Sequence, residues 1–406
     1  MTSLDRIPRM RIIRGADCYW AIGTRSIARL PLAAVTEDRE LVPEAEQLIR
    51  AADLSPTVER DTYQLTVLVT TRCNLACAYC FQNTELPATG QTGIPLRIAG
   101  MSIDEDRTGE ILEFAKRQLA QNGKKALDVM LFGGEPTMYM DQCLRLLRGA
   151  GEIGLARASM ISNGTLFTVP QMKALEEAGL RDVQVTFDGD AEAHDRSRIT
   201  IGGRGTFARI LDNLAEVSQK TDIRWQLRVN LTAESIKGAD RLVDRLSGRL
   251  DPARFGIYFA LVHDPGIGFA GTVEHSRAVA EQVADLYGRV GEAGFPLPRP
   301  TYSTCATCGE TSGRTGATVN ANGVLYSCWE SAGQKGMEVG DVTRGYLPES
   351  VISSRWVACG YTANGQVDPH VRQTFTDTLD ALLLDRHYRS GRLGTGKVRE
   401  ADGAAA

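Results

Sequence analysis

The sequence lacks the features that mark membrane-bound, secreted and nucleic-acid-binding proteins. No apolar run approaches the roughly 20 residues that a membrane-spanning helix needs. The basic N-terminal stretch has no apolar segment of the signal-peptide type behind it, so we expect a cytoplasmic protein. The net charge is −4 at pH 7, whereas a nucleic-acid-binding surface is normally basic. Membrane and nucleic-acid partners are therefore not expected.

The sequence also lacks internal repeats and a disulfide pattern. Its 406 residues exceed the size of most single compact folds, which predicts a main domain with an appendage. Nine cysteines in a long chain without a signal peptide are not expected to form a disulfide framework. Three of them lie within residues 73–80, and the later ones are Cys305, Cys308, Cys328 and Cys359. Such clusters indicate metal or redox chemistry, whereas the isolated Cys18 and Cys143 are interpreted as buried structural residues.

Short apolar runs alternate with amphipathic, helix-like stretches between residues 62 and 300. The runs are 65–70, 129–132, 159–162, 183–187, 225–231 and 256–262. Alternation of this kind predicts βαβ units and a parallel sheet. Six such units would form an incomplete barrel or a strongly curved open sheet.

The fifth of these runs has a regular polar face. Gln226, Arg228 and Asn230 alternate with apolar residues, although strands of a parallel sheet are normally apolar on both faces. Two interpretations stay open: the polar face lines a cavity inside a barrel, or the run is an edge strand that solvent wets.

The chain divides into four predicted parts: an N-terminal cap segment, a core domain, a smaller domain and a disordered tail. Residues 1–60 contain a hairpin at about 19–32 and a helix at about 43–52. A proline-rich stretch marks the end of the core domain, 61–300. Residues 301–388 are rich in glycine and end in a helix at about 374–387. The tail, 389–406, has little apolar content.

Cys73, Cys77 and Cys80 directly follow the first predicted strand, with the spacing C-x3-C-x2-C. Three thiolates on a short loop can hold three irons of a [4Fe–4S] cluster and leave the fourth iron open to a small molecule. Structural zinc prefers four ligands, and this loop has three cysteines and no nearby histidine. Ligand-binding loops of α/β barrels leave the carboxyl ends of the strands, as this loop does.

Further motifs follow at the ends of the next strands. In chain order, they are Gly133-Gly134-Glu135-Pro136, Ser162-Asn163-Gly164, Thr186-Phe187-Asp188-Gly189 and His194-Asp195-x-x-Arg198. With Tyr79 before the third cysteine, this set resembles the signature of radical S-adenosylmethionine enzymes. Ser162 and Thr186 replace a frequent threonine and a frequent serine, and both keep a hydroxyl.

The resemblance implies a partial (β/α)6 TIM-like barrel of the radical SAM type. It also implies reductive cleavage of S-adenosylmethionine to a 5′-deoxyadenosyl radical, with electrons from a donor such as ferredoxin or flavodoxin. Glu135 would take the ammonium of the methionine moiety by a charge-assisted hydrogen bond. The residues expected around the cofactor are Tyr79, Gly133, Gly134, Glu135, Asn163, Thr186, Arg198 and Arg228.

The later cysteines form a second set. Residues 319–328 read as a hairpin with Asn322-Gly323 at the turn. This segment resembles the Gx4C hairpin of SPASM and twitch domains, but the dense later run of cysteines in SPASM domains is missing. We therefore expect one auxiliary [4Fe–4S] cluster on Cys305, Cys308, Cys328 and Cys359. Two alternatives stay open: Cys359 is a plain buried thiol, or the four cysteines bind zinc.

The leading functional hypothesis is an enzyme that modifies a peptide or protein side chain, as in the maturation of ribosomal peptides. It rests on the family resemblance alone. The N-terminal segment would then grip a leader peptide by strand addition. The alternatives are a dehydrogenase or epimerase of a sugar or other small molecule, and a non-catalytic iron–sulfur protein. Candidate proton or hydrogen partners are Arg228, His263, Asp264 and Glu330, and a solvated loop or structural ion pairs are the alternative for each.

Overall fold

The computed structural model describes most of the chain. The described residues are 2–3, 10–24, 26–38, 40–51, 54, 61–80, 82, 99–264, 269–302, 305, 307–308, 312–357, 367–391 and 398–400. One predicted cluster ligand, Cys359, lies outside them. Within these ranges, no helix combines the length and the apolar character that crossing a membrane requires.

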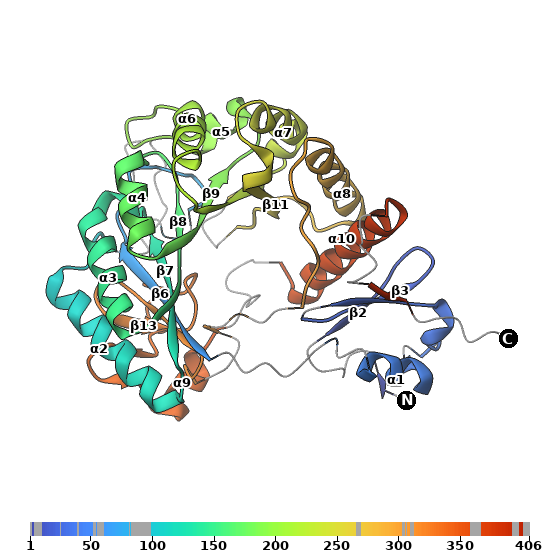
Figure 1. The fold of residues 1–406 in the computed structure, drawn as a ribbon, viewed down its shortest axis with the longest axis horizontal. Coiled ribbons are helices and arrows are strands. Elements are labelled where there is room, and N and C mark those ends of the chain that lie inside the picture. The colour runs from blue at the N-terminus through green and yellow to red at the C-terminus, as the bar shows by residue number, and fades with distance from the viewer. Residues whose placement is uncertain are drawn as a thin grey trace.

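Six parallel strands, adjacent in chain order, form the main part of the central sheet (Figure 1). They are β6 (Thr62–Thr70), β7 (Ala126–Gly133), β8 (Leu155–Ser162), β9 (Leu180–Phe187), β10 (Arg224–Leu231) and β11 (Phe255–Leu261). Each overlaps one of the six predicted strands, so the predicted α/β class is confirmed. Because β10 lies between β9 and β11, the interpretation of that run as an edge strand is wrong.

Helices connect the strands and lie along the outer side of the curved sheet (Figure 1). They are α2 (Glu105–Asn122), α3 (Met140–Ile153), α4 (Val169–Glu177), α5 (Ala191–Ser197), α6 (Phe207–Ser218), α7 (Ala239–Ser247) and α8 (Arg277–Glu292). Local sequence sets their ends. The side chain of Asp104 accepts the N–H of Arg107 at the start of α2, and Gly123 ends that helix at φ +61°.

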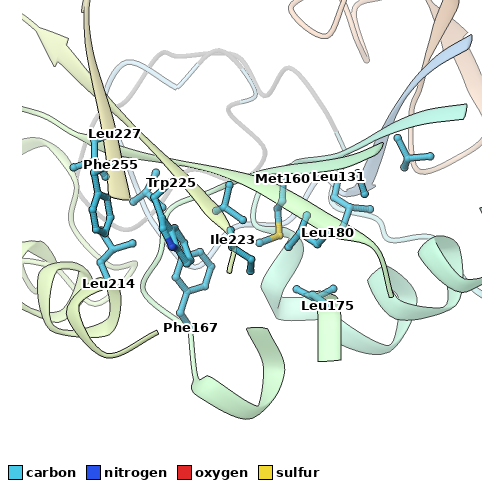
Figure 2. Close-up of a cluster of buried hydrophobic side chains, with 14 of the residues drawn as sticks. Leu131, Met160, Phe167, Leu175, Leu180, Leu214, Ile223, Trp225, Leu227 and Phe255 are labelled. Atoms are coloured by element: carbon cyan, nitrogen blue, oxygen red, sulfur yellow. The ribbon is translucent and has the colours of Figure 1, made fainter. Parts of the chain in front are cut away.

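The apolar core fills the space between the sheet and these helices (Figure 2). Trp225 of β10 is a central member. Its ring centroid lies 6.2 Å from that of Phe255 on the next strand and 5.8 Å from that of Phe167, which precedes α4. The apolar residues of β10 thus face the helices, and its polar residues face the opposite side of the sheet.

The C-terminal region extends the same sheet past β6. It contributes β12 (Gly316–Val319), β13 (Val324–Tyr326), β14 (Gly340–Asp341) and β15 (Gly345–Tyr346), and α9 (Glu349–Arg355) follows. β12 pairs in parallel with β6 and in antiparallel with β13, so the predicted hairpin is confirmed. Gly323 sits in its turn at φ +84°, a conformation that glycine adopts without strain. Sheet hydrogen bonds therefore cross the predicted boundary at residue 300.

A second sheet lies beside the C-terminal helix α10 (Pro369–Arg389) (Figure 1). Its strands are β2 (Arg11–Arg14), β3 (Tyr19–Ile22), β4 (Ile27–Leu30) and β16 (Val398–Glu400). β3 and β4 form the predicted hairpin, and the predicted helix is α1 (Pro43–Ala51). The short strands β1 (Thr2–Ser3) and β5 (Glu40–Leu41) pair with each other. β16 lies within the tail predicted to be disordered and pairs in parallel with β4.

Candidate radical site

The loop that carries the first three cysteines leaves the carboxyl end of β6 and is held by backbone hydrogen bonds. The amide of Ala76 donates to the carbonyl of Ile199 at 2.8 Å, and Leu75 forms an antiparallel bridge with Thr200. Cys73, Cys77 and Cys80, which we call the cluster loop cysteines, are all half-buried. The segment after α5 thus fixes the middle of the loop.

The spacing of the three sulfurs argues against a single metal ion. Among the described residues, Asp17, Cys18 and Asp385 have three candidate metal-ligand atoms within 4.8 Å of one another. These residues are far from the cluster loop in the chain. The sulfurs of Cys73, Cys77 and Cys80 therefore do not all lie within 4.8 Å of one another. Two thiolates bound to one zinc ion lie only about 4 Å apart, because each Zn–S bond is about 2.3 Å. The wider set fits a group of several irons.

Gly133 and Gly134 allow the end of β7 to pack tightly against the start of the cluster loop. Gly133 has φ +125°, and a Cβ added to it would lie 2.0 Å from the carbonyl oxygen of Thr70. A Cβ on Gly134 would lie 2.1 Å from the carbonyl oxygen of Arg72. Both glycines are therefore required by the backbone packing of the loop, whatever binds beside them.

Glu135 is fully buried, and its carboxylate is held by four hydrogen bonds. Oε1 accepts from the amide and hydroxyl of Thr137, at 3.0 and 2.5 Å, and from the hydroxyl of Ser162 at 2.8 Å. Oε2 accepts from the amide of Asn163 at 2.6 Å. Burial raises the pKa of Glu135, and these hydrogen bonds oppose the rise. Oε1 accepts three of these hydrogen bonds and Oε2 only one, so Oε2 is the oxygen that would take a further donor such as an ammonium group.

Asn163 connects the Glu135 site to the cluster loop. Its side-chain amide donates to Oδ1 of Asn74 at 2.8 Å and lies 3.8 Å from the sulfur of Cys73. Its Oδ1 accepts from the amide and hydroxyl of Thr165, which fixes the orientation of the amide group. Hydrogen bonds to cluster sulfurs tune the reduction potential of iron–sulfur centres. Asn163 is thus placed to act on Cys73.

Tyr79 is at the centre of a second group of polar side chains. Its hydroxyl donates to Oδ1 of Asp188 at 2.8 Å and accepts from Nη1 of Arg198 at 2.9 Å and from Nδ2 of Asn230 at 3.0 Å. Asp188, Arg198 and Asn230 are buried. Within the described residues, the buried Nε of Arg198 has no hydrogen-bond partner. The group therefore keeps an unused cationic donor beside the cluster loop.

His194 and Asp195 build the turns that carry Asp188 and Arg198. Burial lowers the pKa of His194 well below its usual value, with a contribution from Arg198. Its Nδ1 accepts the amide of Asp188 at 3.3 Å, so the proton lies on Nε2, 3.1 Å from the hydroxyl of Thr206. Asp195 accepts the amides of Thr206 and Phe207 at the start of α6. Both motif residues are structural.

The polar face of β10 lies on the side of the sheet away from the helices. Arg228 is half-buried, and its Nε donates to Oδ1 of Asn230 at 2.8 Å. The backbone register places Arg228 beside Thr186 on β9 and Tyr258 on β11. Arg228, Asn230 and Tyr79 thus form one hydrogen-bonded chain from the inner face of the sheet to the cluster loop.

The other candidate proton partners lie at the end of this inner face. Burial lowers the pKa of His263, Glu330 opposes that shift, and Arg372 and Arg228 add to it. Asp264 also acts on His263 and raises its pKa. Arg228, Asp264 and Glu330 thus each act electrostatically on His263, and so does Arg372 of α10.

The second cysteine set lies around the hairpin β12–β13. Cys308 and Cys328 are buried and Cys305 is half-buried. The indole N–H of Trp356 donates to the carbonyl of Cys308 at 3.2 Å. The amide and carbonyl of Val357 both bond to the hydroxyl of Ser327, at 3.0 and 2.8 Å. The segment that leads to residue 359 is thus bound next to Cys308 and Cys328.

Comparison with known families identifies the core. Residues 67–244 match the model of the Radical SAM superfamily. The chain contains a radical SAM domain. Enzymes with this domain use a [4Fe–4S] cluster and S-adenosylmethionine, and the three widely spaced thiols and the unused Arg198 donor fit those two groups.

Relatives of the radical SAM domain act on different substrates. The chain is 28% identical to the Fe-coproporphyrin III synthase of Methanosarcina barkeri over 240 residues, which cover 56% of this chain and 52% of the relative. It is 36% identical to the PqqA peptide cyclase of Rhodopseudomonas palustris over 146 residues, covering 36% of this chain and 33% of the relative. The chain thus spans about half the length of the first of these relatives and a third of the second.

The fold of the radical SAM domain and its C-terminal extension is also found in a solved structure. Native anSMEcpe with bound AdoMet and Kp18Cys peptide matches with a TM-score of 0.61. The match covers 82% of this chain and 99% of that chain at 14% sequence identity, so it shows a shared fold.

Three residues of the radical SAM site went unassigned in the sequence. Asp188 lies inside the Thr186–Gly189 motif, and Asn230 belongs to the polar alternation of β10, so both carried a signal. No sequence signal pointed to Arg372, because its helix is more than a hundred residues away from β11 in the chain.

Proposed function

We propose that this protein is a radical SAM enzyme that reductively cleaves S-adenosylmethionine and abstracts hydrogen from a peptide or protein substrate. The observation that carries the proposal is the arrangement of three thiols on one loop beside a buried glutamate and a buried arginine. When bound, the cluster supplies the electron for cleavage. The expected donor is a ferredoxin or flavodoxin.

The residues of the chain would bind and orient the reactants. Cys73, Cys77 and Cys80 would hold the cluster. Oε2 of Glu135 would accept the ammonium of the methionine moiety, since it still has room for a donor. Glycines at 133 and 134 keep the loop close to β7. Phe269 lies against the ring of Tyr79, at 5.8 Å between centroids, and shields the loop from water on that side.

A further part of the proposal is an auxiliary cluster on Cys305, Cys308, Cys328 and Cys359. Its support is that Ser327, next to Cys328, bonds to both backbone groups of Val357, two residues before Cys359.

The peptide substrate is supported by the name of one relative, a peptide cyclase, and by the peptide in the structure of anSMEcpe. The site itself brings the charges of Arg228, Glu330 and Arg372, from three parts of the chain, to act on His263. The alternative is a small-molecule substrate, which the name of the Fe-coproporphyrin III synthase favours. A precursor-peptide gene beside the gene for this protein would favour the peptide substrate.

Anaerobic reconstitution followed by iron and sulfide analysis tests the proposal. We expect about eight irons per chain and 5′-deoxyadenosine on addition of reductant and S-adenosylmethionine. The triple variant C73A/C77A/C80A should keep about four irons and form no 5′-deoxyadenosine. C18A, which removes a buried thiol of the N-terminal sheet, is the matched control and should behave as wild type.

Each failed outcome of this experiment points to a different part of the proposal. Reconstituted wild-type protein that never forms 5′-deoxyadenosine would contradict the enzyme proposal and favour a non-catalytic iron–sulfur protein. About four irons per chain in the wild type would exclude the auxiliary cluster but not the cluster on Cys73, Cys77 and Cys80. C359A and C308A should both lower the amount of iron per chain. A C359A protein with full iron would show that Cys359 is not a ligand.

A further inference from the structure

The hydroxyl of Tyr79 uses all of its hydrogen-bonding capacity on protein groups. A phenol has one proton to donate and accepts about two hydrogen bonds. Tyr79 donates to Asp188 and accepts from Arg198 and Asn230, all between 2.8 and 3.0 Å. The hydroxyl therefore has no capacity left for a bound molecule, and the expectation that Tyr79 binds the cofactor can apply only to its ring.

Two partners of the Tyr79 hydroxyl, Asp188 and Asn230, accept further hydrogen bonds of their own. Oδ2 of Asp188 accepts the hydroxyl of Ser197 at 2.6 Å. Oδ1 of Asn230 accepts Nε of Arg228 at 2.8 Å. The Tyr79 hydroxyl thus ties the cluster loop to the ends of β9 and β10 and to the turn after α5.

Arg198 depends most on this contact. Its guanidinium is buried and donates a hydrogen bond to the hydroxyl of Tyr79, which belongs to the cluster loop. The carboxylate of Asp188, on the other side of the same hydroxyl, balances the charge. A buried cation keeps one orientation only where such partners fix it.

We propose that Tyr79 is a positioning residue, whose hydroxyl orients the Arg198 guanidinium beside the cluster loop together with Asn230. This inference rests on the proposed function, because it concerns the site where S-adenosylmethionine would bind. The ring of Tyr79 packs against Phe269, and phenylalanine keeps that contact while removing only the oxygen. Y79F therefore separates the hydroxyl from the ring.

The test compares reconstituted full-length wild type with Y79F, N230A and the double variant. Three measurements are made: iron per chain, the dissociation constant for S-adenosylmethionine by equilibrium dialysis, and the EPR spectrum of the dithionite-reduced protein with and without S-adenosylmethionine. The control is Y287F, which removes another buried tyrosine hydroxyl, bonded to the amide of Phe259 at 3.1 Å on the outer side of β11.

We expect Y79F to keep wild-type iron and to bind S-adenosylmethionine about tenfold more weakly, the effect of one hydrogen bond to a charged group. N230A should weaken binding as well, in part because Nε of Arg228 loses its acceptor. The loss of affinity in the double variant should be smaller than the sum of the two single losses, because both single changes remove the hydrogen bond between Tyr79 and Asn230. The EPR change should require correspondingly more S-adenosylmethionine. Y287F should bind as wild type.

Unchanged affinity in Y79F, or additive losses in the double variant, would overturn the inference. Loss of iron in Y79F but not in N230A would also overturn it, because the tyrosine would then build the loop and not orient Arg198. If Y79F does not fold, N230A alone decides, and wild-type affinity in N230A overturns the inference. Wild type that fails to bind S-adenosylmethionine refutes the proposed function instead, which is a distinct result.

Discussion

Single side chains at the ends of the parallel strands either hold the site together or remain available to a ligand. His194 and Asp195 belong to the first kind, because their hydrogen bonds go to the turns around α5 and α6. Arg198 and Oε2 of Glu135 belong to the second kind, since each keeps unused hydrogen-bonding capacity. A motif residue is therefore not necessarily a ligand-binding residue.

The buried, neutral His194 predicts a pH dependence of stability. Its pKa in the folded protein lies well below the usual value of about 6.5, so only the unfolded chain takes up this proton as the pH falls. The contribution of His194 is complete above about pH 6.5 and decreases below it, by up to about 1.4 kcal/mol per pH unit. Urea unfolding of the apoprotein at pH 7.5 and 5.5 measures this slope.

The variant H194Q should reduce that slope, although the lowered pKa values of His263 and His275 leave part of it. H370Q changes an exposed histidine at the start of α10 and serves as the control. An equal slope in H194Q and wild type would show that His194 is protonated in the folded protein.

At the scale of helices and strands, the sequence predicted nearly every element that positions the site. Periodic apolar residues predicted β6 to β11, and the Asn322-Gly323 turn predicted the hairpin β12–β13. Pairings between distant segments could not be predicted, because neither β12 nor β6 carries a residue pattern that specifies its neighbour. For the same reason the sequence did not show that Asn230 meets Tyr79.

The close packing of β7 against the cluster loop predicts that G133A damages the radical site. Alanine at φ +125° is strained, and its Cβ would clash with the carbonyl of Thr70. We expect a loss of about 2–3 kcal/mol in unfolding free energy and less iron per chain after reconstitution. G109A is the matched control. It lies in α2 with open space around the added Cβ, so it should be neutral or slightly stabilising. Wild-type iron in G133A would contradict the packing argument.

At the scale of the whole molecule, α10 joins the N-terminal sheet to the radical SAM domain. Arg386 of α10 pairs with Asp285 of α8 at 2.5 Å, and Arg11 of β2 pairs with Asp377 and Asp380 of α10. Trp20 is fully buried, and its indole N–H donates to Asp385 at 2.8 Å. The helix thus has one side on α8 and another on the N-terminal sheet.

This arrangement predicts that the N-terminal sheet can open without the core. W20A should cost about 3–5 kcal/mol, because it removes a large buried ring. Hydrogen exchange should accelerate in residues 11–30 and α10 but not in β7 or β8. L32A, at a site 43% exposed, is the control and should change little. Faster exchange throughout the central sheet in W20A would mean that the two sheets unfold together.

The pairing of β12 with β6 has a consequence for the kind of substrate that fits. Cys73 follows β6 and Cys328 follows β13 in one hydrogen-bonded sheet, in a register that runs from Gly316 beside Gln64 to Val319 beside Val67. Adjacent strands keep a spacing of about 4.8 Å, so the two sets cannot swing apart as domains on a linker would. The distance between them is therefore set by the sheet, and we expect a substrate that contacts both to be selected by its length.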